Sequence, residues 1–280
     1  YLENDCFNHA VWIYDRIFKN DTPVDIAFFG SSHTITGINE MEIEKNLTDT
    51  GLHVANFGYC RLGNNLTYVL LKDLLKQKHP KLIVIEVRGD EDWFSHPVFP
   101  YLADESDVFL PKVLVNRDLF SDLYLAFTYK LQILQRIIFK TAPEVPVKKE
   151  LYGFAATNDT ASDKEISTAN KRLLMKPRIM SETERNFQLK FPRSYNKKVY
   201  DLCSRNGIDI CFLYLPHFAP PYKKPLEYET YLKHGIILYP PDAIMSDPHN
   251  WGDSEHMNKA GANKLAIWLA HELDSLPSLH

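Results

Sequence analysis

The chain lacks several features that would assign a protein to a class at first sight. Its 280 residues include no run close to the ~18 consecutive apolar residues that span a membrane. Lys and Arg number 32 against 36 Asp and Glu, and the net charge of −4 provides no basic surface for nucleic acid. Internal repeats and low-complexity tracts are also absent from the sequence. We therefore expect a globular protein with no transmembrane segment and no nucleic-acid partner.

Cysteine is scarce, with four residues at Cys6, Cys60, Cys203 and Cys211. No pair has the C-x-x-C spacing of zinc or redox motifs. Cys203 and Cys211 fall on an expected helix and the following strand, where they would be buried as small apolar side chains. We therefore expect free cysteines, with a disulfide as the alternative, and no cofactor.

Short apolar runs alternate with segments of helical periodicity along most of the chain. The runs that predict strands are Val24–Phe29, Val54–Phe57, Leu82–Val87, Ile208–Leu215 and Gly235–Tyr239. The segments that predict helices are 1–20, Asn39–Thr50, Asn64–Lys78, Leu119–Phe139, Tyr195–Asn206 and Lys259–Leu273. This alternation is typical of parallel strands joined by crossover helices. The fold class we expect is α/β, a three-layer α/β/α sandwich with a mainly parallel central sheet.

The middle of the chain, residues 93–190, is less regular. Leu119–Phe139 has apolar residues on all sides, which predicts a buried helix. Lys148–Asp163 is polar and mixed, which predicts a surface loop. We interpret 1–280 as a single domain in which 93–190 is an insertion that covers the active edge of the sheet.

Polar or glycine-containing segments follow three of the expected strands. They are Gly30-Ser31-Ser32, Gly58 and Arg88–Asp92. In parallel α/β sheets, ligands bind beyond the carboxyl ends of the strands. These segments should therefore converge on one edge, where we expect a functional site.

Ser32 is the candidate nucleophile at this edge. A serine hydroxyl needs a neighbouring base to become nucleophilic, and a tight turn after a strand leaves backbone N–H groups free to bind an oxyanion. The alternative is a polar turn that only caps the next helix. The spacing differs from the G-x-S-x-G elbow, which disfavours that class of hydrolase.

His256 is the candidate base, and Asp253 is its candidate partner. An Asp-x-x-His turn can place a carboxylate beside the imidazole, which fixes its tautomer and stabilises the imidazolium. The alternative is that Asp253 or Ser254 only caps the last helix. Together with Ser32 at the other end of the chain, the pair suggests a serine esterase or acyl-transfer site.

In these motifs the chain resembles the SGNH/GDSL hydrolase superfamily. The family's first block, Gly-Asp-Ser, is matched by Gly30-Ser31-Ser32, and its Asn-x-Gly block by Asn56-Phe57-Gly58. Its last block, Asp-x-x-His followed by an apolar residue, Asn and a glycine, is matched by residues 253–261. The resemblance implies a flavodoxin-like three-layer α/β fold and acyl-ester chemistry without a metal. It also implies Ser32, His256 and Asp253 as a triad, with the N–H groups of Ser32 and Gly58 in the oxyanion hole.

Two positions depart from the family pattern. Glu91 stands where the family's third block has an Asn that donates to the oxyanion, and an ionised carboxylate cannot donate a hydrogen bond. Arg88 is either a substitute donor or a partner in an ion pair with Asp90 or Asp92. Ser31 replaces the aspartate of the first block, and in this the chain resembles envelope-associated branches that move acyl groups onto bacterial surface polysaccharides.

Other side chains near this edge could contact a substrate. The candidates are His33, Arg88, Glu91, Trp93, His96 and Trp251. The tryptophans could stack on a sugar ring, and ordinary packing is the alternative for each. Asp247 and His249 could form a metal site with Asp253 and His256, but no fixed ligand spacing supports it, and we expect no metal.

Three functional hypotheses follow from these residues. The first is an esterase that removes an acyl group, such as acetyl, from a carbohydrate or related ester. The second is an O-acyltransferase that acts on a bacterial envelope polysaccharide with the same triad. The third is a non-catalytic member that binds a glycan or an envelope partner protein.

The start of the chain bears on where the protein works. It begins at Tyr1 without an initiator Met, so we expect that a signal peptide or an anchor has been removed. Together with the resemblance, this predicts an exported bacterial envelope protein, in the periplasm or on the cell surface. The expectation of free cysteines argues against export, because exported proteins usually carry disulfides.

Overall fold

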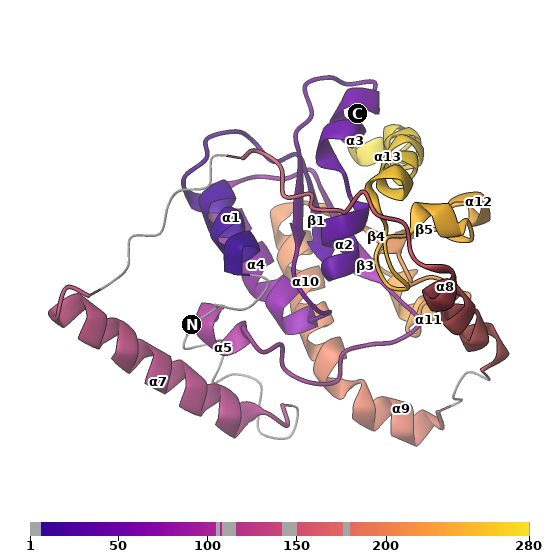
Figure 1. The fold of residues 1–280 in the computed structure, drawn as a ribbon. Coiled ribbons are helices and arrows are strands. Elements are labelled where there is room, and N and C mark those ends of the chain that lie inside the picture. The colour runs from indigo at the N-terminus through magenta and orange to yellow at the C-terminus, as the bar shows by residue number, and fades with distance from the viewer. Residues whose placement is uncertain (1–6, 105–106, 108–115, 142–149, 176–179, 280) are drawn as a thin grey trace.

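A five-stranded parallel sheet forms the centre of the molecule in the computed structural model, which describes residues 7–104, 107, 116–141, 150–175 and 180–279 (Figure 1). Its strands are β1 (Ile26–Gly30), β2 (Val54–Gly58), β3 (Leu82–Val87), β4 (Asp209–Tyr214) and β5 (Ile236–Leu238). Their order is β2-β1-β3-β4-β5, and all neighbouring pairs are parallel. This order is the flavodoxin-like one, so the expected α/β fold is confirmed.

The helices connect and cover these strands. Their bounds are α1 (Phe7–Phe18), α2 (Ser32–Gly37), α3 (Glu40–Asn46), α4 (Asn64–Gln77), α5 (Phe99–Leu102), α7 (Leu119–Ile138), α8 (Asp163–Asn170), α9 (Glu182–Gln188), α10 (Lys190–Asn206), α11 (Tyr228–Tyr231), α12 (Asp242–Met245) and α13 (Lys259–Asp274). Short 3₁₀ turns are η1 (Lys171–Leu174), η2 (Pro248–Asn250) and η3 (Pro277–Leu279).

The strands β1, β2 and β3 are buried along almost their whole length, and their successive side chains point to opposite faces of the sheet. On β1, Ile26 and Phe28 face a core built with α3 and α13, whereas Ala27 and Phe29 face a core built with α1, α4 and α10. The two cores make the molecule a three-layer sandwich, as Figure 1 shows.

Capping residues explain several of the helix boundaries. Asn39 caps α3 by accepting a hydrogen bond from the Glu42 N–H, and Gly207 ends α10 in the left-handed region at φ 66°. The α3 helix stops at Asn46, earlier than the predicted Thr50. Thr48 is instead bonded through its N–H and hydroxyl groups to the carboxylate of Asp274.

The α7 helix forms where the sequence predicts it, but it is not buried. Only Leu119, Asp122 and Ala126 of this helix are buried, and its other large apolar side chains are mostly exposed. Figure 1 shows α7 lying apart from the central sheet, near the short helix α5. The prediction that this helix is buried was wrong. Apolar residues on all sides show that a helix is hydrophobic, but they do not show whether another part of the protein packs against it.

The cysteines differ from the expectation. Cys60 is disulfide-bonded, whereas Cys203 and Cys211 are free and buried. The prediction of free cysteines was therefore wrong for Cys60, since sequence spacing does not reveal which segments fold side by side. Cys6 lies outside the described residues. Within the described part of the chain, no helix combines the length and hydrophobicity needed to cross a membrane.

Candidate active site

The turn after β1 is built around a buried carboxylate. Gly30 ends β1, and a Cβ atom there would lie 2.0 Å from Thr34 Oγ1 and 2.4 Å from Glu86 Oε2. Both distances are far inside van der Waals contact, so only glycine fits between the strand and these side chains. The glycine of this motif is therefore explained by how closely Glu86 approaches the turn.

Ser31 holds the start of α2 in two ways. Its Oγ accepts a hydrogen bond from the His33 N–H at 3.1 Å, which caps the helix, and donates to Glu86 Oε1 at 2.8 Å. Ser32 is then the first residue of α2, where a helix leaves its N–H groups without intrahelical acceptors. The turn thus presents the Ser32 hydroxyl beside an unused backbone donor.

Glu86 on β3 accepts further hydrogen bonds from the Ser31 N–H at 2.7 Å and from Thr34 Oγ1 at 2.6 Å. Burial acts to raise the pKa of Glu86, but the charge of Arg88, the neighbouring His33 ring and these hydrogen bonds outweigh it and lower the pKa. The guanidinium Nε of Arg88 lies 3.5 Å from Glu86 Oε1, close enough for an ion pair though not aligned for a hydrogen bond. An anionic Glu86 thus fixes the turn that carries Ser32.

Ser32, His256 and Asp253 come together as a hydrogen-bonded chain. His256 Nε2 lies 2.8 Å from Ser32 Oγ, and His256 Nδ1 lies 2.9 Å from Asp253 Oδ2. Asp253 Oδ1 also accepts the backbone N–H groups of Glu255 and His256, both at 2.7 Å. Burial acts to raise the pKa of Asp253, but the hydrogen bonds from the His256 ring and from these N–H groups lower it overall. The ring N–H of His256 therefore faces an ionised carboxylate, and its Nε2 lone pair faces the serine.

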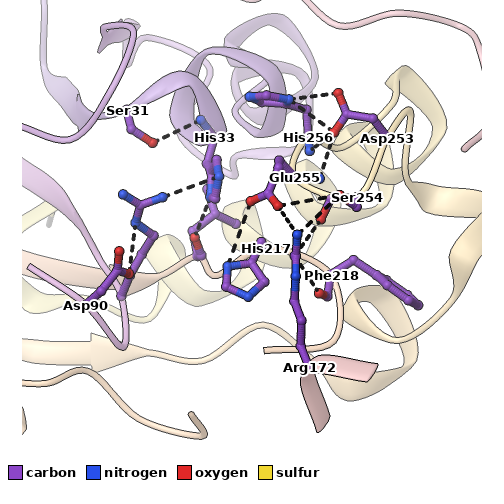
Figure 2. A network of polar contacts seen from close by, with 12 residues as sticks. Ser31, His33, Asp90, Arg172, His217, Phe218, Asp253, Ser254, Glu255 and His256 are labelled. Atoms are coloured by element: carbon purple, nitrogen blue, oxygen red, sulfur yellow. Dashed lines mark hydrogen bonds and ion pairs between the residues drawn. The ribbon is translucent and has the colours of Figure 1, made fainter. Parts of the chain in front are cut away.

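The loop between Asp253 and His256 is braced from outside by Arg172 of η1. Figure 2 shows the Arg172 guanidinium reaching the loop beside Phe218 and His217. It donates to the Ser254 carbonyl oxygen at 3.3 Å and also contacts the carboxylate of Glu255. His217 Nδ1 lies 3.9 Å from the same carboxylate. The hydrogen bond from Arg172 thus ties the Asp-x-x-His turn to a segment about 80 residues earlier in the chain.

A cleft of about 580 Å³ opens on Ser32 and His256. Its walls come from α1, α2, the segment after β2, and residues 150–157. The apolar contributors are Trp12, Ile35, Phe154 and Met257. The cleft is therefore large enough for a small organic ligand and mostly apolar beside the serine.

Glu40 fastens residues 150–157 to the body of the protein. Its Oε1 accepts hydrogen bonds from Gly153 N at 2.7 Å and Asn56 N at 3.0 Å, and its Oε2 accepts one from Phe154 N at 3.0 Å. The Ala155 N–H donates to the Ile35 carbonyl oxygen at 3.1 Å, next to Ser32's helix. One wall of the cleft is thus held by a buried carboxylate together with a backbone hydrogen bond to α2.

Gly58 does not offer the expected oxyanion donor. Its N–H donates to Asn56 Oδ1 at 3.0 Å, inside the protein. A Cβ atom on Gly58 would lie 2.9 Å from both Ser31 O and Ile35 N, so glycine here lets α2 pack against β2. The Asn-x-Gly motif therefore positions α2, and the expectation for Gly58 is corrected. The Ser32 N–H has no acceptor among the described residues.

His33 and Arg88 lie beneath the triad and do not line the cleft. His33 Nδ1 donates to the Leu215 carbonyl oxygen at 3.1 Å, and its Nε2 faces Arg88 Nη1 at 3.4 Å. Burial lowers the pKa of His33, despite the nearby carboxylate of Glu86. The His33 ring meets the His256 ring edge-on, with centroids 5.6 Å apart. Arg88 is bound to Glu86 and to Asp90, at 3.7 Å, so of its two alternatives the ion pair is observed.

The other substrate-binding candidates also lie away from the cleft lining. Glu91 is buried and accepts hydrogen bonds from Asn64 and Tyr231, and burial raises its pKa to about 7. His96 is buried, donates to the Cys60 carbonyl oxygen at 2.6 Å, and has a pKa lowered to about 4 by burial.

Neither tryptophan offers a stacking surface to the cleft. Trp251 is 1% exposed, packs on Phe218 and donates to the Met245 carbonyl oxygen. Trp93 is half-buried and outside the cleft lining. The expectation that these residues contact substrate in this cleft is corrected, because Trp251 is buried in the core and Trp93 lies outside the cleft lining.

The acidic residues near the end of the chain make local pairs. Asp247 Oδ1 accepts a hydrogen bond from His249 Nδ1 at 3.0 Å, and Asp253 Oδ2 accepts one from His256 Nδ1 at 2.9 Å. Within the described residues, no group of His, Cys, Asp or Glu side chains has the arrangement of a metal site.

Comparisons with known proteins add no further assignment. Neither the models of protein families nor the curated proteins include a match to this chain. The arguments for function therefore rest on the site itself.

Sequence reasoning missed three residues that support the site: Glu40, Glu86 and Arg172. Glu86 left a visible signal, because a lone carboxylate in the apolar run Leu82–Val87 is costly unless it is paired. Glu40 and Arg172 left none, since their partners are far away in the sequence.

Proposed function

We propose that the protein is a serine esterase of the SGNH type that cleaves an acyl ester through Ser32, His256 and Asp253. The observation that carries the proposal is the continuous hydrogen-bond chain from Asp253 through His256 to Ser32, with the distances of 2.9 and 2.8 Å. A nucleophile, a base and a group that orients the base are the parts that acyl transfer requires.

The reaction proceeds in two stages. Ser32 Oγ attacks the ester carbonyl carbon while its proton passes to His256 Nε2, and the intermediate collapses as the alcohol leaves with that proton. Water then loses a proton to Nε2 and attacks the acyl-serine ester, which releases the acid and returns the proton to Oγ. Asp253 stays ionised throughout and stabilises the imidazolium. The Ser32 N–H is the backbone donor available to the oxyanion.

The cleft favours an ester of moderate size. Trp12, Ile35, Phe154 and Met257 offer apolar surface to an acyl group or to one face of a sugar ring. A disulfide at Cys60 supports an exported protein, because disulfides persist in oxidising compartments. We therefore propose an acylated carbohydrate of the bacterial envelope as the substrate class.

The test is turnover of p-nitrophenyl acetate by the wild type and by Ser32→Ala and His256→Ala. Each variant should lose activity by a factor on the order of 10⁴, because the members of a triad act as a unit. The matched controls are Ser181→Ala, an exposed helix cap, and His249→Ala, an exposed histidine that also pairs with an aspartate. Equal activity in all five proteins would refute Ser32 as the nucleophile.

An inactive wild type calls for a second measurement. A fluorophosphonate probe labels an activated serine without needing the natural substrate. Labelling that is lost in Ser32→Ala would support the triad and direct the search to a transferase with its own donor. Absence of labelling would favour a protein that only binds glycan or an envelope partner.

A further inference from the structure

The first motif of the chain departs from the family pattern at Ser31, and the structure places a carboxylate at that departure. Ser31 stands where the Gly-Asp-Ser block has its aspartate. Its Oγ lies 2.8 Å and 3.0 Å from the two carboxylate oxygens of Glu86, which reaches the turn from β3. The turn before the candidate nucleophile therefore has its acidic group on the neighbouring strand and not in the motif itself.

Glu86 is buried and fastens the residues on both sides of Ser32. Its Oε2 accepts hydrogen bonds from the Ser31 N–H at 2.7 Å and from the Thr34 hydroxyl at 2.6 Å. Ser32 lies between these two residues, as the first residue of α2. Neither Ser31 nor Glu86 lines the cleft, so any effect of this pair on the reaction passes through the position of Ser32.

The space between the turn and β3 suits one carboxylate and not two. An aspartate at position 31 would bring its carboxylate against Glu86, because the Ser31 Oγ is already within hydrogen-bond distance of both Glu86 oxygens. Two buried carboxylates in direct contact cannot both stay ionised. Arg88 does not remove this conflict, since its guanidinium is already shared between Glu86 at 3.5 Å and Asp90 at 3.7 Å.

A hydroxyl at position 31 avoids the conflict. The Ser31 Oγ donates to Glu86 Oε1 and still accepts the His33 N–H that caps α2. An aspartate would make the same cap, because aspartate and serine are comparably good at this position of a helix. The presence of Glu86, and not the cap, is therefore what distinguishes serine from aspartate at position 31.

We propose that Ser31 and Glu86 act as one unit that positions Ser32, in which the negative charge sits on either residue but not on both. They are positioning residues and do not touch the reacting ester. The proposal rests on the proposed function, because the unit acts on the nucleophile. It explains how the chain departs from Gly-Asp-Ser and keeps the turn: Glu86 carries the charge that Ser31 lacks.

An exchange of the two groups tests this unit. In the double variant Ser31→Asp/Glu86→Gln, the glutamine oxygen can accept from the N–H of residue 31 and from the Thr34 hydroxyl, and its NH₂ group can donate to the new carboxylate. The double variant therefore keeps one negative charge beneath Ser32. The single variant Ser31→Asp has two carboxylates at this place, and Glu86→Gln has none.

The measurements are kcat and KM for p-nitrophenyl acetate and the rate at which a fluorophosphonate labels Ser32. Ser31→Asp should lower kcat on the order of 100-fold and Glu86→Gln about tenfold, with little change in KM, because a displaced nucleophile costs rate more than binding. The labelling rate should fall in the same order. Independent effects would multiply to about 1000-fold, whereas the double variant should stay within about tenfold of the wild type.

Two matched controls change the same residue types elsewhere. Ser181→Asp alters an exposed helix cap on α9, and Glu91→Gln neutralises another buried carboxylate, whose partners are Asn64 and Tyr231. Both controls should keep the kcat of the wild type, because neither residue contacts the turn that carries Ser32. Urea unfolding of each variant separates a lower kcat from a loss of folded protein.

Two results would overturn the proposal when the wild type is active or labelled. One is a double variant as slow as the product of its two single variants, and the other is Glu86→Gln with the kcat and labelling rate of the wild type. If Ser31→Asp does not fold, the comparison of Glu86→Gln with Glu91→Gln still decides the role of Glu86. A wild type that neither hydrolyses the ester nor is labelled would refute the proposed function itself, and this proposal with it.

Discussion

Replacing Glu40 with glutamine tests how the protein holds one wall of its cleft. Burial raises the pKa of Glu40 from 4.5 to about 7, against the opposing effect of the backbone N–H groups of Gly153, Asn56 and Phe154. A raised pKa means that the folded protein binds the proton more tightly than the unfolded chain does. The contribution of Glu40 to stability is then complete below pH 4.5 and is lost as the pH rises through 7.

The magnitude follows from the two pKa values. The difference between 4.5 and about 7 corresponds to about 3 kcal/mol, at 1.36 kcal/mol per pKa unit. Glutamine has nearly the same shape and does not ionise. Relative to the wild type, the free energy of unfolding of Glu40→Gln should therefore rise by about 3 kcal/mol between pH 4.5 and pH 8.

The assay is urea unfolding at these two pH values, followed by tryptophan fluorescence. Trp12 reports on the same wall, because its indole N–H donates to the Glu150 carbonyl oxygen at 2.9 Å. Comparing variant with wild type at each pH cancels the buried histidines, whose lowered pKa values act on stability in the opposite direction. Glu91→Gln is a parallel test of the same sign, since burial also raises the pKa of Glu91 to about 7.

A difference that is independent of pH would refute this reasoning, and so would one that shifts in favour of the wild type as the pH rises from 4.5 to 8. The second result would mean that the N–H donors stabilise the anion more than burial penalises it. Glu40 would then be an ionised clamp on residues 150–157, with its largest contribution at neutral pH.

Three further predictions concern the turn and the triad. Gly30→Ala should lower the free energy of unfolding by about 1–3 kcal/mol or more, measured in urea, because its Cβ would overlap Glu86. Arg172→Met should lower kcat for p-nitrophenyl acetate by about tenfold with little change in KM, and Arg172→Lys should restore part of it. An unchanged kcat would remove Arg172 from the positioning of the Ser254 loop. Asp253→Asn should lower kcat on the order of 10⁴-fold without loss of folding, checked by its urea midpoint.

The centre of the sheet was predictable from the sequence because β1, β2 and β3 are buried on both faces. Leu82–Val87 was predicted with the bounds that β3 has, since an apolar run broken only by Glu86 lies between His79-Pro80 and a polar segment. The convergence of strand ends was predictable for the same reason. It places Ser32 at the carboxyl end of β1, where the structure also has it.

Contacts between distant segments could not be predicted in this way. Glu86 reaches Ser31 across 55 residues, and Glu40 reaches Gly153 across 113. Hydrophobic periodicity carries no information about such pairs, because it describes one element at a time. The same limit explains why the candidates after β3, such as Glu91 and His96, were assigned to the cleft when they belong to the core.

The Asp-x-x-His motif shows how geometry separates two interpretations that the sequence leaves open. Either Asp253 caps the last helix, or it accepts a hydrogen bond from the His256 ring and orients it. The cap of α13 is Asn258, whose side chain accepts from the Gly261 N–H at 3.0 Å. Asp253 is five residues earlier, and it binds the backbone N–H and the ring of His256 at once. Since one carboxylate fixes both the turn and the imidazole, the three-residue spacing is explained by the orientation of His256 toward Ser32 and is not required by the helix.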